Sequence, residues 1–172
     1  MRAIPSFVLM IACAASPALA QSEGPAPVSW GGDIGIFAPF ESGSGSSFTG
    51  RFTADVATGD RLGLRFAAGF ANPTLGGDAL DSHADLVYVS GGVIQRLGAS
   101  SYRPYVHGGV GIYHLSGDRS GTDVGLSLGS GFELRSGIAR TVLTPELTAH
   151  LISGDAPRFS LALTVGLHTR PR

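Results

Sequence analysis

The sequence predicts an all-β fold: a closed, antiparallel, up-and-down transmembrane β-barrel of eight strands. The first observation is that apolar residues alternate with small or polar ones at a period of two, which is typical of strands with two different faces. The second is that clusters of Gly, Ser, Asp and Pro interrupt this alternation at regular intervals. The third is the composition. The 172 residues include 26 glycines and no lysine, whereas soluble proteins normally cover their surface with lysine and glutamate.

The first twenty residues have the features of a cleaved signal peptide. Arg2 provides a positive start, Ser6 to Ala15 are mostly apolar, and Ala18-Leu19-Ala20 ends the segment with a small-x-small cleavage pattern. A lipoprotein would be cleaved before Cys13 instead, but the residues before Cys13 match that signal poorly. We therefore expect export and a mature domain of residues 21–172. That domain has no cysteine and no apolar run long enough for a transmembrane helix.

The alternation divides the mature domain into eight strands. We expect them at about residues 28–40, 47–57, 61–71, 84–96, 102–115, 122–134, 141–152 and 158–169. The last strand shows the pattern best, while the fourth is apolar on both faces and cannot be oriented from its sequence. An even number of strands returns both termini to one side, which we expect to be the periplasm. The longest connector, residues 72–83, then lies on the outer side, as in other membrane barrels.

The chemistry of the two faces decides between a membrane barrel and a soluble, lipocalin-like barrel. The polar face consists mostly of Gly, Ala, Ser and Thr, which makes a poor surface for water but suits the narrow lumen of an eight-stranded barrel. The other face carries Phe, Leu, Ile and Val with almost no charge, as contact with lipid requires. We therefore expect a membrane barrel, whose lipid-facing residues include Trp30, Phe52, Phe66, Phe132 and Leu163.

Two stretches carry a resemblance to a known family: Tyr102-Arg-Pro-Tyr-Val-His-Gly-Gly-Val-Gly-Ile-Tyr and Leu161-Ala-Leu-Thr-Val-Gly-Leu. The chain resembles the small outer-membrane β-barrel proteins of the OmpA/OmpX type. This resemblance implies a Gram-negative outer membrane location. It also implies outer-membrane lipid, lipopolysaccharide and the barrel-assembly machinery as partners. Such proteins usually end on an aromatic residue that the machinery reads, whereas here Thr169 holds that position.

Ionisable residues on the predicted inner face form a candidate site. They are Asp33, Arg51, Asp55, Arg65, Arg103, His107, Glu133, Glu146 and His150. Strand directions place Asp33, Asp55 and Arg65 at similar depth, and Arg103, Glu133 and Glu146 in a second group on later strands. Because a buried unpaired charge is expensive, we expect an internal salt-bridge network that blocks the lumen. The alternative is a selective polar pathway for small solutes.

No catalytic, cofactor or metal residues are assigned. Lipid A deacylases carry a His-x-Ser-Asn arrangement that this chain lacks, and His150 and Ser153, with Glu146 nearby, have opposite strand parity. His107 and His114 also differ in parity and cannot share a metal.

The longest connector contains the only other candidate cation site. His83 with Asp78, Asp81 and Asp85 is a conceivable set of ligands, but such a cluster is more typical of a solvated turn. No glycine-rich phosphate loop precedes a helix, and the near-balanced charge gives no reason to expect nucleic acid binding.

The sequence thus favours an outer-membrane barrel with a structural or surface-interaction role and a blocked lumen. A narrow channel and a lipid-modifying enzyme remain as alternatives, and no extracellular ligand is indicated.

Overall fold

The computed structural model describes residues 27–41, 43–75, 82–98, 102–117, 120–138, 140–154 and 158–169. The expected signal peptide lies outside these residues and stays a prediction. Within the described ranges, no helix is long and apolar enough to cross a membrane.

Eight long strands and one short one make up the described part of the chain. They are β1 (Val28–Pro39), β2 (Ser47–Ala57), β3 (Leu62–Ala71), β4 (Thr74–Leu75), β5 (Ser82–Arg96), β6 (Tyr102–Gly117), β7 (Gly121–Arg135), β8 (Thr141–Ile152) and β9 (Phe159–Thr169). The expected strand boundaries differ from these by no more than two residues. The short strand β4 was not expected; it pairs with the start of β5.

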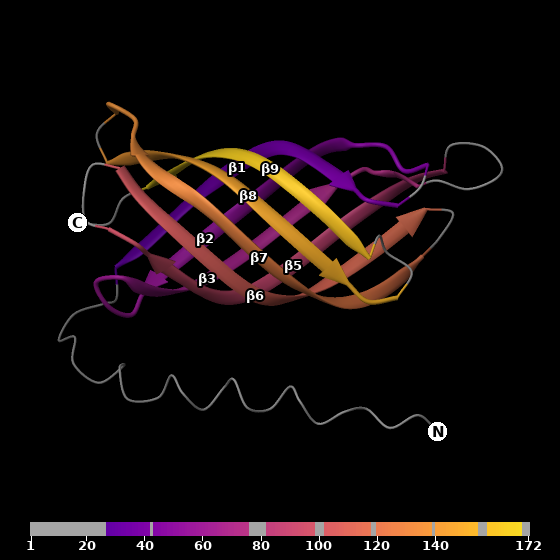
Figure 1. Ribbon diagram of the computed structural model, residues 1–172, viewed down its shortest axis with the longest axis horizontal. Helices are drawn as coiled ribbons and strands as arrows, with labels where there is room; N and C mark the ends of the chain where they lie inside the picture. The colour runs from indigo at the N-terminus through magenta and orange to yellow at the C-terminus, as the bar shows by residue number, and fades with distance from the viewer. Residues whose placement is uncertain are drawn as a thin grey trace, which may run out of the picture.

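The long strands close into a single barrel (Figure 1). Each pairs antiparallel with its sequence neighbour, β3 pairs with β5 across the short β4, and β1 pairs with β9 to close the sheet. The prediction of a closed, eight-stranded, antiparallel barrel is confirmed. We call the end where β1 begins and β9 finishes the termini end, and the opposite end the loop end.

Side-chain burial separates the two faces of the wall. Large apolar side chains are exposed on the outside of every long strand, among them Trp30, Phe52, Leu128 and Leu163. The inside holds buried polar and charged residues, such as Asp33 and Glu146, each 2% exposed. This polarity is the reverse of that in a soluble barrel.

The structure orients β5, which its sequence left undecided. Leu86, Tyr88, Ile94 and Arg96 are buried in the lumen, while Val87, Val89 and Val93 are exposed outside. The strand is apolar on both faces because its loop-end half faces an apolar part of the lumen.

Two layers fill the lumen. Toward the loop end lies the apolar layer, a cluster of Phe37, Ala71, Ala84, Leu86, Tyr88, Tyr113, Leu115, Ile152 and Ala162. Toward the termini end lies the ionic layer, formed by Asp33, Arg51, Asp55, Arg65, Arg96, Glu133 and Glu146. The sequence predicted that charge pairs block the lumen, and it did not predict the apolar layer.

Candidate functional site in the lumen

Glu146 on β8 is the centre of the ionic layer. Its Oε1 atom accepts hydrogen bonds from Arg51 Nη1 at 2.6 Å, Thr148 Oγ1 at 2.7 Å and His107 Nε2 at 3.0 Å. Its Oε2 atom accepts from Arg65 Nη1 and from the Tyr105 hydroxyl, both at 2.7 Å. Five donors therefore surround one buried carboxylate, which satisfies its lone pairs and fixes its orientation.

Asp33 on β1 is surrounded in the same way. Arg51 Nε donates to its Oδ2 atom at 3.1 Å, and Thr53 Oγ1 donates to the same atom at 3.0 Å. Its Oδ1 atom accepts from His168 Nε2 at 3.0 Å and from Thr144 Oγ1 at 3.4 Å. Arg51 therefore joins Asp33 to Glu146 across the lumen.

Asp55 on β2 joins the central pairs to the termini end. Arg65 donates two hydrogen bonds to its carboxylate, from Nε at 2.8 Å and from Nη2 at 3.0 Å. Arg96 Nη2 donates to it at 3.1 Å, and Arg96 Nε also donates to Glu133 Oε1 at 2.7 Å. The resulting chain of alternating acids and arginines runs in the order Asp33, Arg51, Glu146, Arg65, Asp55, Arg96, Glu133.

This chain differs in detail from the two predicted groups. The sequence placed Glu146 with Arg103 and Glu133, whereas the structure joins it to Arg51 and Arg65. Sequence reasoning missed Arg96, because the inner face of its strand could not be recognised, and it left out the smaller donors Thr53 and Thr148. Thr53 lies between Arg51 and Asp55 on the same face of one strand, and this alternation could have added Thr53 to the predicted site.

The remaining predicted lumen residues lie inside the barrel with different surroundings. Arg103 is only loosely paired, since its Nη1 atom is 4.0 Å from Glu133 Oε2. His107 lies against Glu146, within the ionic layer. His150 lies in the apolar layer, where its Nδ1 atom is 3.0 Å from the Tyr113 hydroxyl and its ring packs near Phe37.

Little open space separates the two layers. A cavity of about 20 Å³ lies between them, lined by residues that include Arg51, Arg65, Tyr88 and His150. That volume is enough for about one water molecule. The lumen is therefore packed where the layers meet.

The three residues considered for catalysis, His150, Ser153 and Glu146, lie in different surroundings. His150 is buried in the lumen, whereas Ser153 is exposed and its hydroxyl donates to the Val124 carbonyl at 2.7 Å. Glu146 is fully engaged in the ionic layer. These three side chains do not form a nucleophile-base arrangement.

The candidate cation ligands of the long connector are only partly described. Asp78 and Asp81 lie outside the described residues, and so does the side chain of His83. Asp85 accepts a hydrogen bond from the Asn72 side-chain amide. Among the described residues, no group of three potential ligands is close enough to hold a metal ion.

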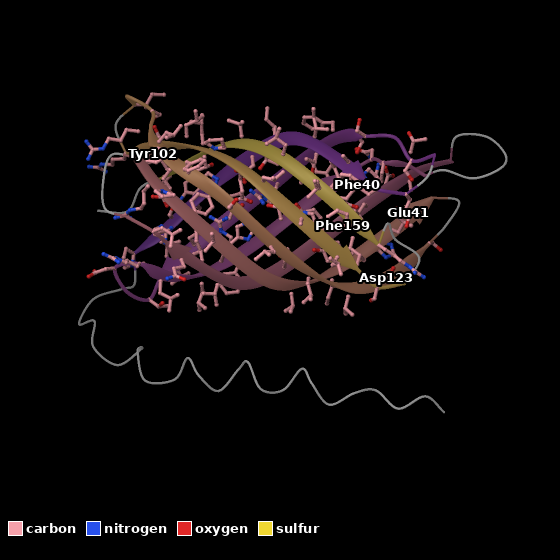
Figure 2. The ribbon with its side chains drawn as sticks, in the orientation of Figure 1. Phe40, Glu41, Tyr102, Asp123 and Phe159 are labelled. Carbon is pink, nitrogen blue, oxygen red and sulfur yellow. The ribbon has the colours of Figure 1, made fainter. Side chains whose placement is uncertain are left out.

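Aromatic pairs lie on the outside near both ends of the barrel. At the termini end, Trp30 stacks on Phe52 at 6.3 Å between ring centroids, and Tyr102 stacks on Phe132 at 4.9 Å. At the loop end, Phe40 packs near Phe159 at 5.3 Å, and Phe48 packs near Phe70 at 6.1 Å. Figure 2 shows Tyr102 at one end of the barrel and Phe40 and Phe159 toward the other. The sequence placed Trp30, Phe52 and Phe132 on the lipid-facing side, and the structure shows that they belong to aromatic pairs between neighbouring strands.

The five residues expected to face lipid all lie on the outer face. Trp30, Phe52, Phe66, Phe132 and Leu163 are between 39% and 58% exposed, in the company of other large apolar residues.

Comparison with solved structures identifies the fold. Neisserial surface protein A (NspA) has a TM-score of 0.71 and 15% sequence identity, over 86% of this chain and 99% of that one. The outer membrane protein OprG from Pseudomonas aeruginosa has a TM-score of 0.61 and 12% identity, over 84% and 96%. The chain has the fold of the small eight-stranded outer-membrane barrels. The resemblance expected from the sequence is confirmed for the fold.

The same fold also occurs in an enzyme. The outer membrane enzyme PagL matches with a TM-score of 0.51 and 15% identity, over 80% of this chain and 99% of that one. No family model and no curated protein matches the chain by sequence. The fold alone therefore does not assign a role.

Proposed function

We propose that this chain is an integral outer-membrane protein with a structural or surface-interaction role and a lumen closed by its own side chains. The observation that carries the proposal is the polarity of the wall, with large apolar side chains outside and ion pairs inside. Water would not stabilise such an exterior, whereas acyl chains would. The fold of the solved neighbours supports the outer membrane as the location.

The proposed position in the membrane follows from the limits of the apolar band. Polar residues appear on the outer face where β5, β6 and β7 approach the loop end, including Asp85, His114 and Thr122. His114 and Thr122 are hydrogen-bonded to each other at 2.9 Å across exposed wall. We place this end in the outer leaflet and beyond, with the termini end in the periplasm, where barrel assembly would take place.

The structural role is favoured over a channel because the two layers block the lumen in series. The ionic layer lies across the half near the termini end, and the apolar layer lies across the other. An enzymatic role lacks support, because His150 and Ser153 lie in separate environments.

Two measurements test the proposal. The mature chain folded in detergent should migrate differently on a gel before and after boiling, and it should precipitate when detergent is removed. In planar bilayers it should give no frequent, stable, large openings. A mature chain that stays monomeric in water without detergent would refute the membrane location, and large stable openings would refute the closed lumen.

A further inference from the structure

A polar cavity opens at the termini end of the barrel, beneath the ionic layer. Its volume is about 230 Å³, and its lining includes Ser29, Asp55, Arg96, Arg103 and Glu133. We call this space the vestibule. It lies outside the packed lumen and is more than large enough for a small solute.

Arg103 is the member of the vestibule that lacks a close partner. The other lumen arginines contact carboxylates at 2.6 to 3.1 Å, whereas Arg103 reaches Glu133 only at 4.0 Å. Its Nε atom is buried and has no hydrogen-bond partner among the described residues. A buried donor without an acceptor is costly. The Arg103 side chain as a whole is 24% exposed, so its guanidinium is open to an added acceptor.

The carboxylates of the vestibule are already occupied. Asp55 is bound by Arg65 and Arg96, and Glu133 is bound by Arg96 through its other oxygen. Neither carboxylate is therefore a well-placed partner for Arg103. Because arginines already neutralise most of their charge, the two carboxylates repel an incoming anion only weakly.

The surrounding rim adds positive charge. The described arginines and carboxylates nearest the opening at the termini end are Arg61, Arg96, Arg103, Arg135 and Arg140 on one side and Asp55, Asp60 and Glu133 on the other. Five arginines against three carboxylates leave a surplus of two positive charges. Arg61, Arg135 and Arg140 are exposed, and none of them forms an ion pair within the described part of the chain.

We propose that the vestibule binds a phosphate group through Arg103, carried either by a small periplasmic solute or by a phospholipid headgroup. A phosphate monoester carries about two negative charges near neutral pH and the diester of a phospholipid carries one, so the positive surplus of the rim attracts either group. The planar guanidinium of arginine fits phosphate oxygens with two parallel hydrogen bonds. The location of the vestibule in the periplasm rests on the proposed function, but phosphate binding by the vestibule does not.

The test uses the mature barrel folded in neutral detergent, titrated with inorganic phosphate at constant ionic strength and followed by calorimetry. We expect saturable binding in the wild type. Arg103→Gln should weaken the affinity by at least about tenfold, because it removes a charge-assisted contact. Glu133→Gln should strengthen it, since it removes the nearest competing carboxylate.

Two matched variants control for general charge effects. Arg158→Gln removes an exposed arginine at the loop end and should leave phosphate affinity unchanged. Arg135→Gln should weaken it by no more than about twofold, because an exposed rim charge contributes little. Mobility before and after boiling confirms that each variant is folded.

A soluble phosphate and a lipid headgroup are distinguished by repeating the titration in nanodiscs of phosphatidylcholine with or without phosphatidylglycerol. Loss of phosphate binding in either nanodisc indicates that a lipid phosphate enters the vestibule, because both lipids carry one, and retained binding in both indicates a soluble solute. The proposal is overturned if the wild type shows no saturable binding, or if Arg103→Gln binds as tightly as the wild type. Either result would leave the gel and conductance tests of the proposed function unaffected.

Discussion

Glu146 is the residue on which most of the ionic layer depends. It takes hydrogen bonds from Arg51, Arg65, Tyr105, His107 and Thr148. A buried ion pair gives little net stability compared with apolar residues, but removal of one partner leaves the other charge uncompensated. Two arginines would lose their shared carboxylate at once if Glu146 were neutralised.

We therefore expect Glu146→Gln to lower the free energy of unfolding by about 3–5 kcal/mol. The matched control is Glu133→Gln, which affects a partly exposed side chain whose close ion pair is with Arg96 alone. It should cost no more than about 1–2 kcal/mol. Urea unfolding from lipid vesicles, followed by the fluorescence of Trp30, measures both. Equal losses in the two variants would show that Glu146 is not the centre of the network.

Close approach of neighbouring strands gives a second prediction at the level of single residues. Gly35 faces the lumen on β1, and a Cβ atom there would overlap with the backbone of Leu163 and Thr164 on β9. Gly32 faces outward, and a Cβ atom there would have Arg51 O as its nearest neighbour at 4.0 Å.

Gly35→Ala should therefore destabilise the barrel by about 1–3 kcal/mol through overpacking. Gly32→Ala should be neutral or slightly stabilising, because alanine restricts the unfolded chain. The same vesicle unfolding assay distinguishes them. A loss of stability in Gly32→Ala equal to that in Gly35→Ala would argue against the tight β1–β9 contact.

At the level of elements, the strands differ in how well their sequences predicted them. In β9, apolar residues on one face and Ser, Thr and Gly on the other specify both the strand and its orientation. In β5 both faces are apolar, because Leu86 and Tyr88 enter the apolar layer while Val87 and Val89 face outward. Alternation identifies a face only where lumen and exterior differ in polarity, so β5 could be located but not oriented.

The same limit explains which parts of the candidate site were found. Arg51, Asp55, Arg65 and Glu146 stand out on polar inner faces, so their shared location was predictable from parity alone. The grouping of Asp55 with Arg65 on neighbouring strands is confirmed by their ion pair. Partners on distant strands were not predictable, because barrel tilt shifts the height at which such strands meet. The Arg65–Glu146 contact joins β3 to β8, which do not pair in the sheet.

The aromatic residues at the termini end give a prediction about membrane depth. Trp30 is 54% exposed, stacks on Phe52 and lies near the start of β1. Tryptophan prefers the boundary between headgroups and acyl chains. Brominated lipids should therefore quench its fluorescence most strongly when the bromines lie high on the chain, near the headgroup. Strongest quenching by bromines near the bilayer centre would place the termini end deeper than proposed.

At the scale of the whole molecule, the ionic and apolar layers act as two barriers along one axis. Resistances in series add, so opening one layer leaves the conductance limited by the other. Replacing Asp33 and Arg51 together by Ser removes an ion pair from the ionic layer without leaving an unmatched charge in that pair. Replacing Phe37 and Tyr113 by Ser removes two large rings from the apolar layer.

We expect each of these double variants to conduct about as poorly as the wild type in planar bilayers, since an eight-stranded barrel is just wide enough for side chains to fill. The fourfold variant should show a conductance well above the sum of the two double variants. Mobility before and after boiling establishes that all three are folded. If the Asp33 and Arg51 variant alone conducted as well as the fourfold variant, the apolar layer would not be a barrier, and the closed lumen would depend on the ion pairs alone.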